Sequence, residues 1–301
     1  MAKNLLEYPG VKDLYERASE ILKTDILRVC LEGPADKLTK TIFTQPALVV
    51  TSLAAVLKLK SQNTKMVENC VATAGFSVGE MAALVFAGAL TFEQGVQMTK
   101  IRAESMQKCC DKYRGSMLSV SLGHESELRS AINAAKLYCV EKCNISKPVL
   151  KIACHLHAEC KVVAGHAQAV KYLEDNASAF GIKKTSPVPV SGAFHTPLMH
   201  QASISLKEKL TGIAESIKSP QIPVVSNVSA EPYRNRESIP QFLSDQVVKT
   251  VKWEQTMHAL FSRPNGEPFP KVYEVGPGKQ LGSILRIVSR PAFKNYNHIS
   301  P

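Results

Sequence analysis

One short stretch limits the possible folds more than any other. In "ATAGFSVGEMAALVF", residues 72–86, a glycine-serine-glycine turn separates two apolar segments. The residues at 67–75 predict a short buried strand, and those at 80–87 predict a helix. Glycine two residues before and after the serine leaves room for a sharp turn with a strained backbone. The pattern favours Ser77 as a nucleophile exposed on that turn; the competing interpretation is ordinary glycine punctuation.

A serine nucleophile needs an oxyanion donor and a base. The amide of Val78 would lie at the positive end of the predicted helix and could donate to an oxyanion. Of the eight histidines, His195 follows an extended apolar segment in "PVPVSGAFHTPLM", as site residues of open α/β sheets do; the alternative is a plain loop histidine. The aspartates between Ser77 and His195 are Asp111 and Asp175, and neither is well placed for a triad. A histidine held by a backbone carbonyl is the other arrangement to consider.

Arg102 is a further candidate site residue. It lies on a helix predicted from residue 93 to 108, with Met98 and Met106 one turn to either side. A solvated arginine is the ordinary expectation on such a helix. An arginine half-buried beside methionines would instead need a carboxylate, supplied by the protein or by a substrate.

Alternating strand and helix patterns predict an α/β fold. Between residues 116 and 190 the predicted order is β-α-β-β-α-β, the ferredoxin-like arrangement. The sequence therefore predicts a discontinuous α/β core with a mostly parallel sheet, residues 1–115 and 191–301, and an inserted ferredoxin-like lobe, residues 116–190.

Helix boundary signals occur at three places. Apolar spacing predicts a helix across 11–33 that Gly-Pro ends. Thr44 is a candidate cap with Pro46 in the first turn of the next helix. Thr91 and Gln94 have the spacing of a capping box, which opens the helix that carries Arg102.

The charge balance points to acidic partners. The chain has 37 Lys and Arg against 26 Asp and Glu, a net charge of +11. Such a surface attracts polyanions and acidic proteins. No basic run with interleaved aromatics and no nucleic-acid-binding motif is present, so we expect no nucleic acid partner. An acidic carrier protein or coenzyme A fits the positive charge as well as a nucleic acid would.

The sequence disfavours several other classes of protein: membrane, secreted, disulfide-rich and metal-binding proteins. The longest apolar run, near 82–90, is too short to span a bilayer, so no membrane partner is expected. The N-terminal residues lack the pattern of a secretory or transit peptide. Eight irregularly spaced cysteines indicate reduced thiols. Cys154, His155, His157 and Cys160 match no standard zinc spacing, so no metal site is predicted.

Taken together, the motifs resemble those of the malonyl-coenzyme A:acyl carrier protein transacylases, which share their fold with the acyltransferase domains of fatty-acid and polyketide synthases. The resemblance spans essentially the whole chain, in the family's order: "GPADKLTKTIFTQPAL", "GFSVGEMAALVFAG", "KIRAESMQ", "VVAGH", "PVSGAFHTPLM", "VVSNV", "VKWEQTMHA" and "YEVGPGKQLGSIL". Phe76 stands where bacterial members commonly have histidine. Together with "SGAFHT" and "VKWEQTMHA", this residue makes the sequence resemble the animal mitochondrial form. The resemblance implies an α/β-hydrolase-like core and a location in the mitochondrial matrix.

The resemblance also implies roles for individual residues. Ser77 would be acylated by malonyl-coenzyme A, His195 would be its general base, and the main-chain carbonyl of Gln246 would orient that histidine. Arg102 would pair with the free carboxylate of the malonyl group, a contact that penalises acetyl. Phe194 resembles the malonyl-selecting variant.

Further implications concern the acyl pocket and the partners. Met106 and Met117 match positions that line the pocket. No cofactor is implied besides malonyl-coenzyme A as substrate. The phosphopantetheine thiol of an acidic acyl carrier protein would take the acyl group, and the protein is expected to act as a monomer.

One departure from the family bears on activity. Family members begin with a strand that ends in a "PGQGSQ" loop, whose glutamine amide is the second oxyanion donor, whereas this sequence starts where that loop should just have ended. We therefore expect weaker oxyanion stabilisation, since one such donor is typically worth about 10²–10³ in rate. Two alternatives to a transferase are a serine hydrolase of acyl thioesters and a low-activity form that only docks the carrier protein.

Overall fold

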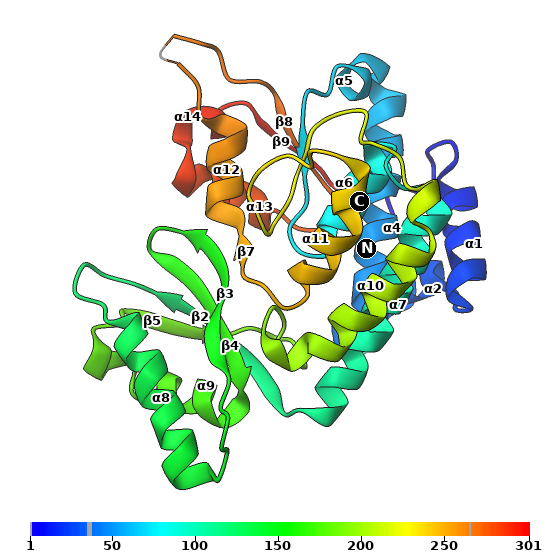
Figure 1. Ribbon diagram of the computed structural model, residues 1–301. Helices are drawn as coiled ribbons and strands as arrows, with labels where there is room; N and C mark the ends of the chain where they lie inside the picture. Colours follow the sequence, from blue (N-terminus) through cyan, green and yellow to red (C-terminus); the bar gives the residue numbers. More distant parts are fainter. Residues whose placement is uncertain (1, 35–37, 265) are drawn as a thin grey trace.

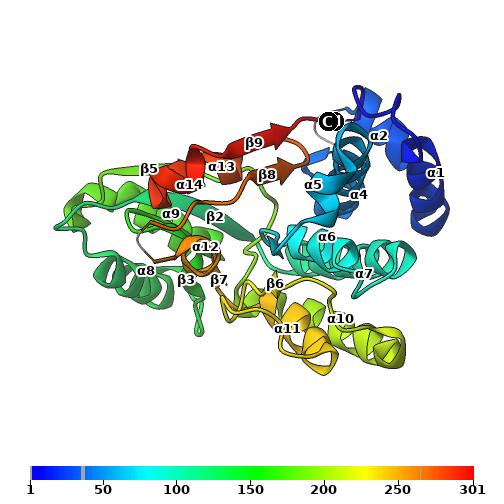
Figure 2. The same cartoon turned by 90° about the horizontal axis from the view of Figure 1, so that it is seen from above.

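A mixed α/β architecture is seen in the computed structural model, which describes residues 2–34, 38–264 and 266–301. Both views place α8 and α9 at one end of the molecule and α1 and α2 at the other (Figures 1 and 2). The helices are α1 Val11–Leu22, α2 Ile26–Glu32, α4 Thr41–Gln62, α5 Thr64–Glu68, α6 Gly79–Phe86, α7 Phe92–Lys112, α8 Leu128–Cys143, α9 Ala167–Asp175, α10 His200–Gly212, α11 Ile239–Gln246, α12 Trp253–Phe261, α13 Gln280–Val288 and α14 Arg290–Phe293. The 3-10 turns are η1 Ala177–Phe180, η2 Pro197–Met199, η3 Ala214–Ser216 and η4 Arg236–Ser238. The strands are β1 Thr73–Ala74, β2 Gly115–Ser121, β3 Leu150–His157, β4 Cys160–His166, β5 Lys184–Pro187, β6 Val224–Val225, β7 Val251–Lys252, β8 Val272–Val275 and β9 Tyr296–Ile299.

The lobe between residues 115 and 187 contains the elements that the sequence predicts there, in the order β2-α8-β3-β4-α9-β5. Its sheet has the strand order β5-β2-β4-β3-β7, and the four lobe strands pair antiparallel. Alternate side chains face opposite sides of a strand. Leu118 and Val163 therefore pack with α8 and α9 on one face, whereas Met117 and Ala164 pack with α12 and α13 on the other.

The lobe is also joined to the rest of the chain through its sheet. Strand β7 pairs parallel with β3, with Cys154 opposite Val251. The largest sheet is therefore mixed, and its last strand comes from the C-terminal part of the chain.

Parallel pairing outside the lobe is confined to short pairs, β1 with β6 and β8 with β9. The expected strand at 67–75 is shorter than predicted, because α5 occupies its first residues and only Thr73 and Ala74 pair with β6. The prediction of one mostly parallel core sheet is therefore correct for the direction of these pairs and wrong for their extent. Figure 2 shows β6 between α6 and α11, where its pairing with β1 supports the site.

Two helix predictions need correction. The segment 11–33 forms two helices, because Lys23 adopts a left-handed conformation and Asp25 accepts a hydrogen bond from the Arg28 amide to cap α2. Helix α4 begins before Thr44, whose hydroxyl donates to the Lys40 carbonyl at 2.9 Å instead of capping, and Pro46 lies inside the helix.

The capping box at the start of α7 is confirmed, and that helix runs four residues further than predicted, to Lys112. Helix α7 packs against both α4 and α10. This position brings the middle of α7, where Arg102 lies, under the turn after β1.

Helix α4, and not the run near 82–90, is long and apolar enough to cross a membrane by length and composition. More than half of its most apolar window is buried inside the protein, as in the central helix of a globular domain. In the structure this apolar surface packs against α1, α2 and α7.

Candidate active site

The turn after β1 has the strained geometry that the sequence predicts. Ser77 has a φ of 51°, in the left-handed region that residues with a Cβ seldom occupy. A Cβ on Gly75 would lie 2.0 Å from the Gly79 backbone, so only glycine fits at that position. A Cβ on Gly79 would meet nothing within 4 Å, so the predicted steric need for the second glycine is wrong.

Ser77 and His195 lie in hydrogen-bond contact although 118 positions separate them. The Ser77 Oγ is 2.9 Å from His195 Nε2, and His195 Nδ1 is 2.7 Å from the carbonyl oxygen of Gln246. A carbonyl oxygen can only accept, so Nδ1 carries the proton and the lone pair of Nε2 faces the serine. The predicted histidine is thus oriented by a backbone carbonyl, with the tautomer that a general base requires.

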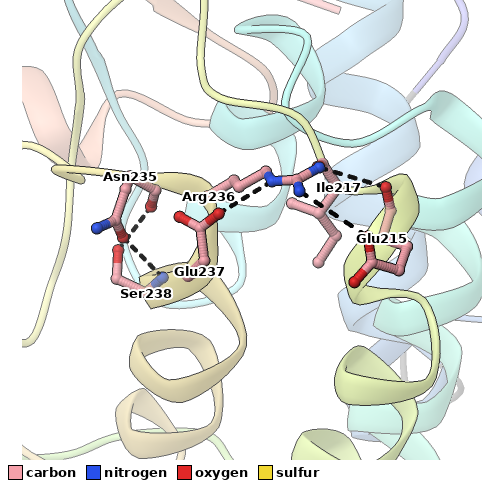
Figure 3. A network of polar contacts seen from close by, with 6 residues as sticks. All are labelled: Glu215, Ile217, Asn235, Arg236, Glu237 and Ser238. Atoms are coloured by element: carbon pink, nitrogen blue, oxygen red, sulfur yellow. Dashed lines mark hydrogen bonds and ion pairs between the residues drawn. The ribbon is translucent and has the colours of Figure 1, made fainter.

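The loop that carries His195 is fixed to the end of α11. The His195 amide donates to the Val247 carbonyl at 3.1 Å, and His195 has a φ of 61°. The other end of α11 is held by a polar network, shown in Figure 3. There Asn235 caps the Ser238 amide at 3.0 Å, and Arg236 contacts Glu237 and the Glu215 carbonyl.

Arg102 is buried, contrary to the ordinary expectation of a solvated arginine. Its Nη2 donates to Ser77 Oγ at 3.0 Å and to the side-chain oxygen of Gln246 at 2.9 Å, and its Nη1 donates to Gln45. No carboxylate forms an ion pair with Arg102 in the described part of the chain. Burial lowers the pKa of Arg102 to about 10, and the charge of Glu80 opposes that shift.

The electrostatics keep His195 neutral. Burial and the neighbouring Arg102 cation lower the pKa of His195 to about 3, against the opposing effect of its bond to Gln246. At neutral pH the imidazole is therefore unprotonated and free to take a proton from Ser77.

The remaining predicted residues surround this centre. The Val78 amide donates no hydrogen bond to any residue that the structure describes, so it is available to a ligand. Phe194 is half-buried and packs against two apolar clusters, one with Met106 and the other with Met117. The Gln45 amide contacts Met106 Sδ at 3.4 Å, which places that methionine beside the partner of Arg102.

Sequence reasoning missed one acid. Glu80, three residues after Ser77, is fully buried behind the turn. It accepts hydrogen bonds from the Tyr233 hydroxyl at 2.6 Å, from the Asn227 amide at 3.2 Å, and from Gln246 Nε2. Burial raises the pKa of Glu80, and these hydrogen bonds oppose the shift. A charged residue opening the apolar segment "GEMAALVF" was the available signal.

The other acids and the cysteine-histidine segment lie elsewhere. Asp111 accepts from Gln107, and Asp175 pairs with Lys171, both on exposed helix faces. His157 and Cys160 face each other across β3 and β4. No group of three or more Cys, His, Asp or Glu side chains that could hold a metal occurs in residues 2–34, 38–264 and 266–301.

Comparisons with known proteins place the chain in a family. Residues 1–268 match the family model described as acyl transferase domain. The chain is 44% identical over 299 residues to the human mitochondrial malonyl-CoA-acyl carrier protein transacylase, covering 99% of this chain and 76% of that protein. It is 34% identical to the malonyl CoA-acyl carrier protein transacylase of Bacillus subtilis strain 168, covering 96% of this chain and 86% of that protein.

The fold is similar to that of the malonyl CoA-acyl carrier protein transacylase from Coxiella burnetii, with a TM-score of 0.84 and 29% identity over 98% of this chain and 87% of that one. The matching family model and the extent of these similarities lead to one conclusion: the chain belongs to the acyl transferase family that includes the malonyl-CoA-acyl carrier protein transacylases.

Proposed function

We propose that this protein is an acyltransferase that moves a malonyl group from malonyl-coenzyme A, through an ester on Ser77, to the phosphopantetheine thiol of acyl carrier protein in fatty acid synthesis. One observation carries the proposal. The Ser77 Oγ lies 2.9 Å from His195 Nε2 and 3.0 Å from Nη2 of the buried Arg102. A nucleophile and a cation that pairs with no carboxylate of the described residues therefore meet at one point, as a malonyl thioester requires.

The residues support a two-step transfer. As Ser77 Oγ attacks the thioester carbonyl, His195 Nε2 accepts its proton, and the Val78 amide donates to the oxyanion. The carbon–sulfur bond breaks and His195 returns the proton to the sulfur of coenzyme A. In the second step the carrier thiol gives its proton to His195 and attacks the ester, and Ser77 regains a proton as it leaves.

Selectivity is assigned to the residues around the acyl group. Arg102 would hold the free carboxylate of malonyl with two hydrogen bonds, while Met106, Met117 and Phe194 line the acyl pocket. The side-chain oxygens of Gln45 and Gln246 already orient the guanidinium. An acetyl donor would leave that buried charge without a carboxylate, which costs binding energy on the scale of kcal/mol.

The domain organisation is part of the same proposal. We assign residues 1–115 and 191–301 to an α/β-hydrolase-like core and residues 116–190 to a ferredoxin-like lobe. The lobe strand order β5-β2-β4-β3, with α8 and α9 on one face, supports that assignment.

Partners and location follow from the relatives and from charge. The human and mouse relatives are named mitochondrial, and we assign this protein to the mitochondrial matrix. A net charge of +11 favours an acidic carrier protein. We propose a monomer that needs no cofactor, nucleic acid or membrane.

The test is mass spectrometry of the Ser77 peptide after mixing with malonyl- or acetyl-coenzyme A, followed by carrier protein. The proposal predicts a malonyl adduct on Ser77 that the carrier removes, and no adduct in Ser77→Ala. Equal labelling by both donors would remove the role given to Arg102. Release of malonate to water faster than transfer to the carrier would identify a hydrolase instead.

A further inference from the structure

Burial raises the pKa of Glu80, but the hydrogen-bond partners of its carboxylate favour the ionised form. Glu80 is fully buried, and each side chain or amide hydrogen-bonded to it among the described residues can donate. The Tyr233 hydroxyl bonds one carboxylate oxygen, while the Asn227 amide and Gln246 Nε2 bond the other. An ionised carboxylate only accepts hydrogen bonds, so donors on both of its oxygens are the satisfied arrangement for the charged form.

The amide of Gln246 links Glu80 to the nucleophile. Its Nε2 donates to Glu80 and, at 2.9 Å, to the main-chain oxygen of Ser77. This fixes which end of the amide faces which neighbour, so the side-chain oxygen must point toward Arg102, 2.9 Å away. A flipped amide would place its NH₂ group against the guanidinium, donor against donor.

Among the residues that the structure describes, the hydrogen-bond partners of Arg102 are neutral. Its guanidinium donates to the oxygens of Gln45, Gln246 and Ser77, and none of these carries a charge. Glu80 is the nearby buried anion whose charge favours the charged form of Arg102. It stands behind Gln246, so it balances the charge of Arg102 without occupying the side that faces Ser77. A carboxylate bonded directly to Arg102 would fill the place of the malonyl carboxylate.

We propose that Glu80 is a positioning residue for selectivity: acting through the side-chain amide of Gln246, it holds Arg102 charged and aimed at the acyl group on Ser77. This rests on the proposed function above. Glu80 favours donors that carry a free carboxylate, and it has a smaller effect on the chemistry that acetyl and malonyl share. A residue that only stabilised the fold would affect both donors alike.

The test compares Glu80→Gln with Tyr233→Phe, which removes a different hydrogen bond from the same carboxylate. Rates of Ser77 labelling by malonyl- and acetyl-coenzyme A are measured by mass spectrometry for both variants and the wild type. In Glu80→Gln we expect the malonyl-to-acetyl ratio to fall about tenfold or more, because a neutral amide permits Gln246 to flip. In Tyr233→Phe the ratio should stay within about threefold of wild type, since Gln246 keeps its charged acceptor.

Failure of this inference is distinct from failure of the proposed function. If the wild type shows a malonyl preference and Glu80→Gln keeps it, or slows both donors equally, Glu80 has no role in selectivity. If the wild type labels with neither donor, the proposed function itself fails.

A stability measurement covers the case in which Glu80→Gln folds poorly. Glu80→Gln, Arg102→Met and the double variant form a cycle with the wild type, followed by urea unfolding. If Glu80 balances the charge of Arg102, the double variant unfolds at a higher urea concentration than Glu80→Gln alone, because the uncompensated cation is gone. A double variant no more stable than Glu80→Gln overturns the proposal.

Discussion

Two polar networks hold the two ends of α11, and they differ in burial and in how the arginine meets its carboxylates. At its N-terminal end, Arg236 contacts Glu215 and Glu237 (Figure 3). The exposed fraction of the side chain is 40% for Arg236, 100% for Glu215 and 67% for Glu237. At its C-terminal end, Gln246 joins Glu80 and Arg102, all of them buried. Arg236 pairs directly with two carboxylates, whereas the amide of Gln246 lies between Arg102 and the single carboxylate of Glu80.

Exposure to solvent determines how much each network contributes to stability and to the geometry of the site. Exposed ion pairs are weakened by water and salt, so the Arg236 network contributes little beyond fixing a local turn. In the buried network each polar group lacks water as a substitute partner, and a lost contact leaves an unpaired charge or donor. That is also why burial lowers the pKa of His195 to about 3 and that of Arg102 to about 10.

The largest effect should come from the turn that carries the serine. In Gly75→Ala the new Cβ would clash with the Gly79 backbone at 2.0 Å, so the turn must open and Ser77 must leave His195. We expect malonyl labelling of Ser77 to fall by about 10³. Gly79→Ala is the matched control, because its Cβ meets nothing within 4 Å, and it should keep labelling within about threefold. Equal rates for the two variants would contradict this account of the turn.

Arg102→Met should have the next largest effect. The substitution keeps apolar volume beside Met106 but removes the bonds to Ser77, Gln45 and Gln246. We expect malonyl labelling to fall about 100-fold, because the substrate carboxylate loses a charged partner in a buried site. Acetyl labelling should change by less than about fivefold. A parallel loss for both donors, measured on the Ser77 peptide, would argue that Arg102 serves only the serine.

A feature can be predicted from the sequence when the residues that form it lie close together along the chain. The turn at Ser77 is a local pattern with glycines at fixed offsets, and the lobe strands are long enough to show alternation, so both could be predicted. The core strands β1 and β6 have two residues each, too few for any periodicity. The extent of the strand predicted at 67–75 was therefore wrong.

The buried acid shows the same limit. Glu80 is close to Ser77 in the sequence, yet its partners Asn227 and Tyr233 lie about 150 positions away. No local pattern indicates that they meet. The bond of His195 to the Gln246 carbonyl was expected only through the resemblance to a family, since any residue can offer a carbonyl.

The protonation of His195 gives a prediction for stability against pH. Its pKa is about 3 in the folded protein and about 6.5 when unfolded, so between these values the unfolded chain binds more protons. This contribution to stability is full above pH 6.5 and is lost as the pH falls toward 3. From pH 7.5 to 5.5 the wild type should lose about 1.4 kcal/mol more than His195→Gln in urea unfolding. Identical losses would mean that His195 titrates normally in the folded protein.

The smallest effect should come from the exposed network. In Arg236→Ala the bonds to Glu215, Glu237 and the Ile217 carbonyl are lost, but water can replace each of them. We expect a melting temperature within about 2 °C of wild type and an unchanged malonyl-to-acetyl labelling ratio. A drop of more than about 4 °C, or a changed ratio, would mean that the N-terminal end of α11 controls the position of Gln246. With both results as expected, the exposed end of α11 is not needed to hold the Gln246 carbonyl on His195.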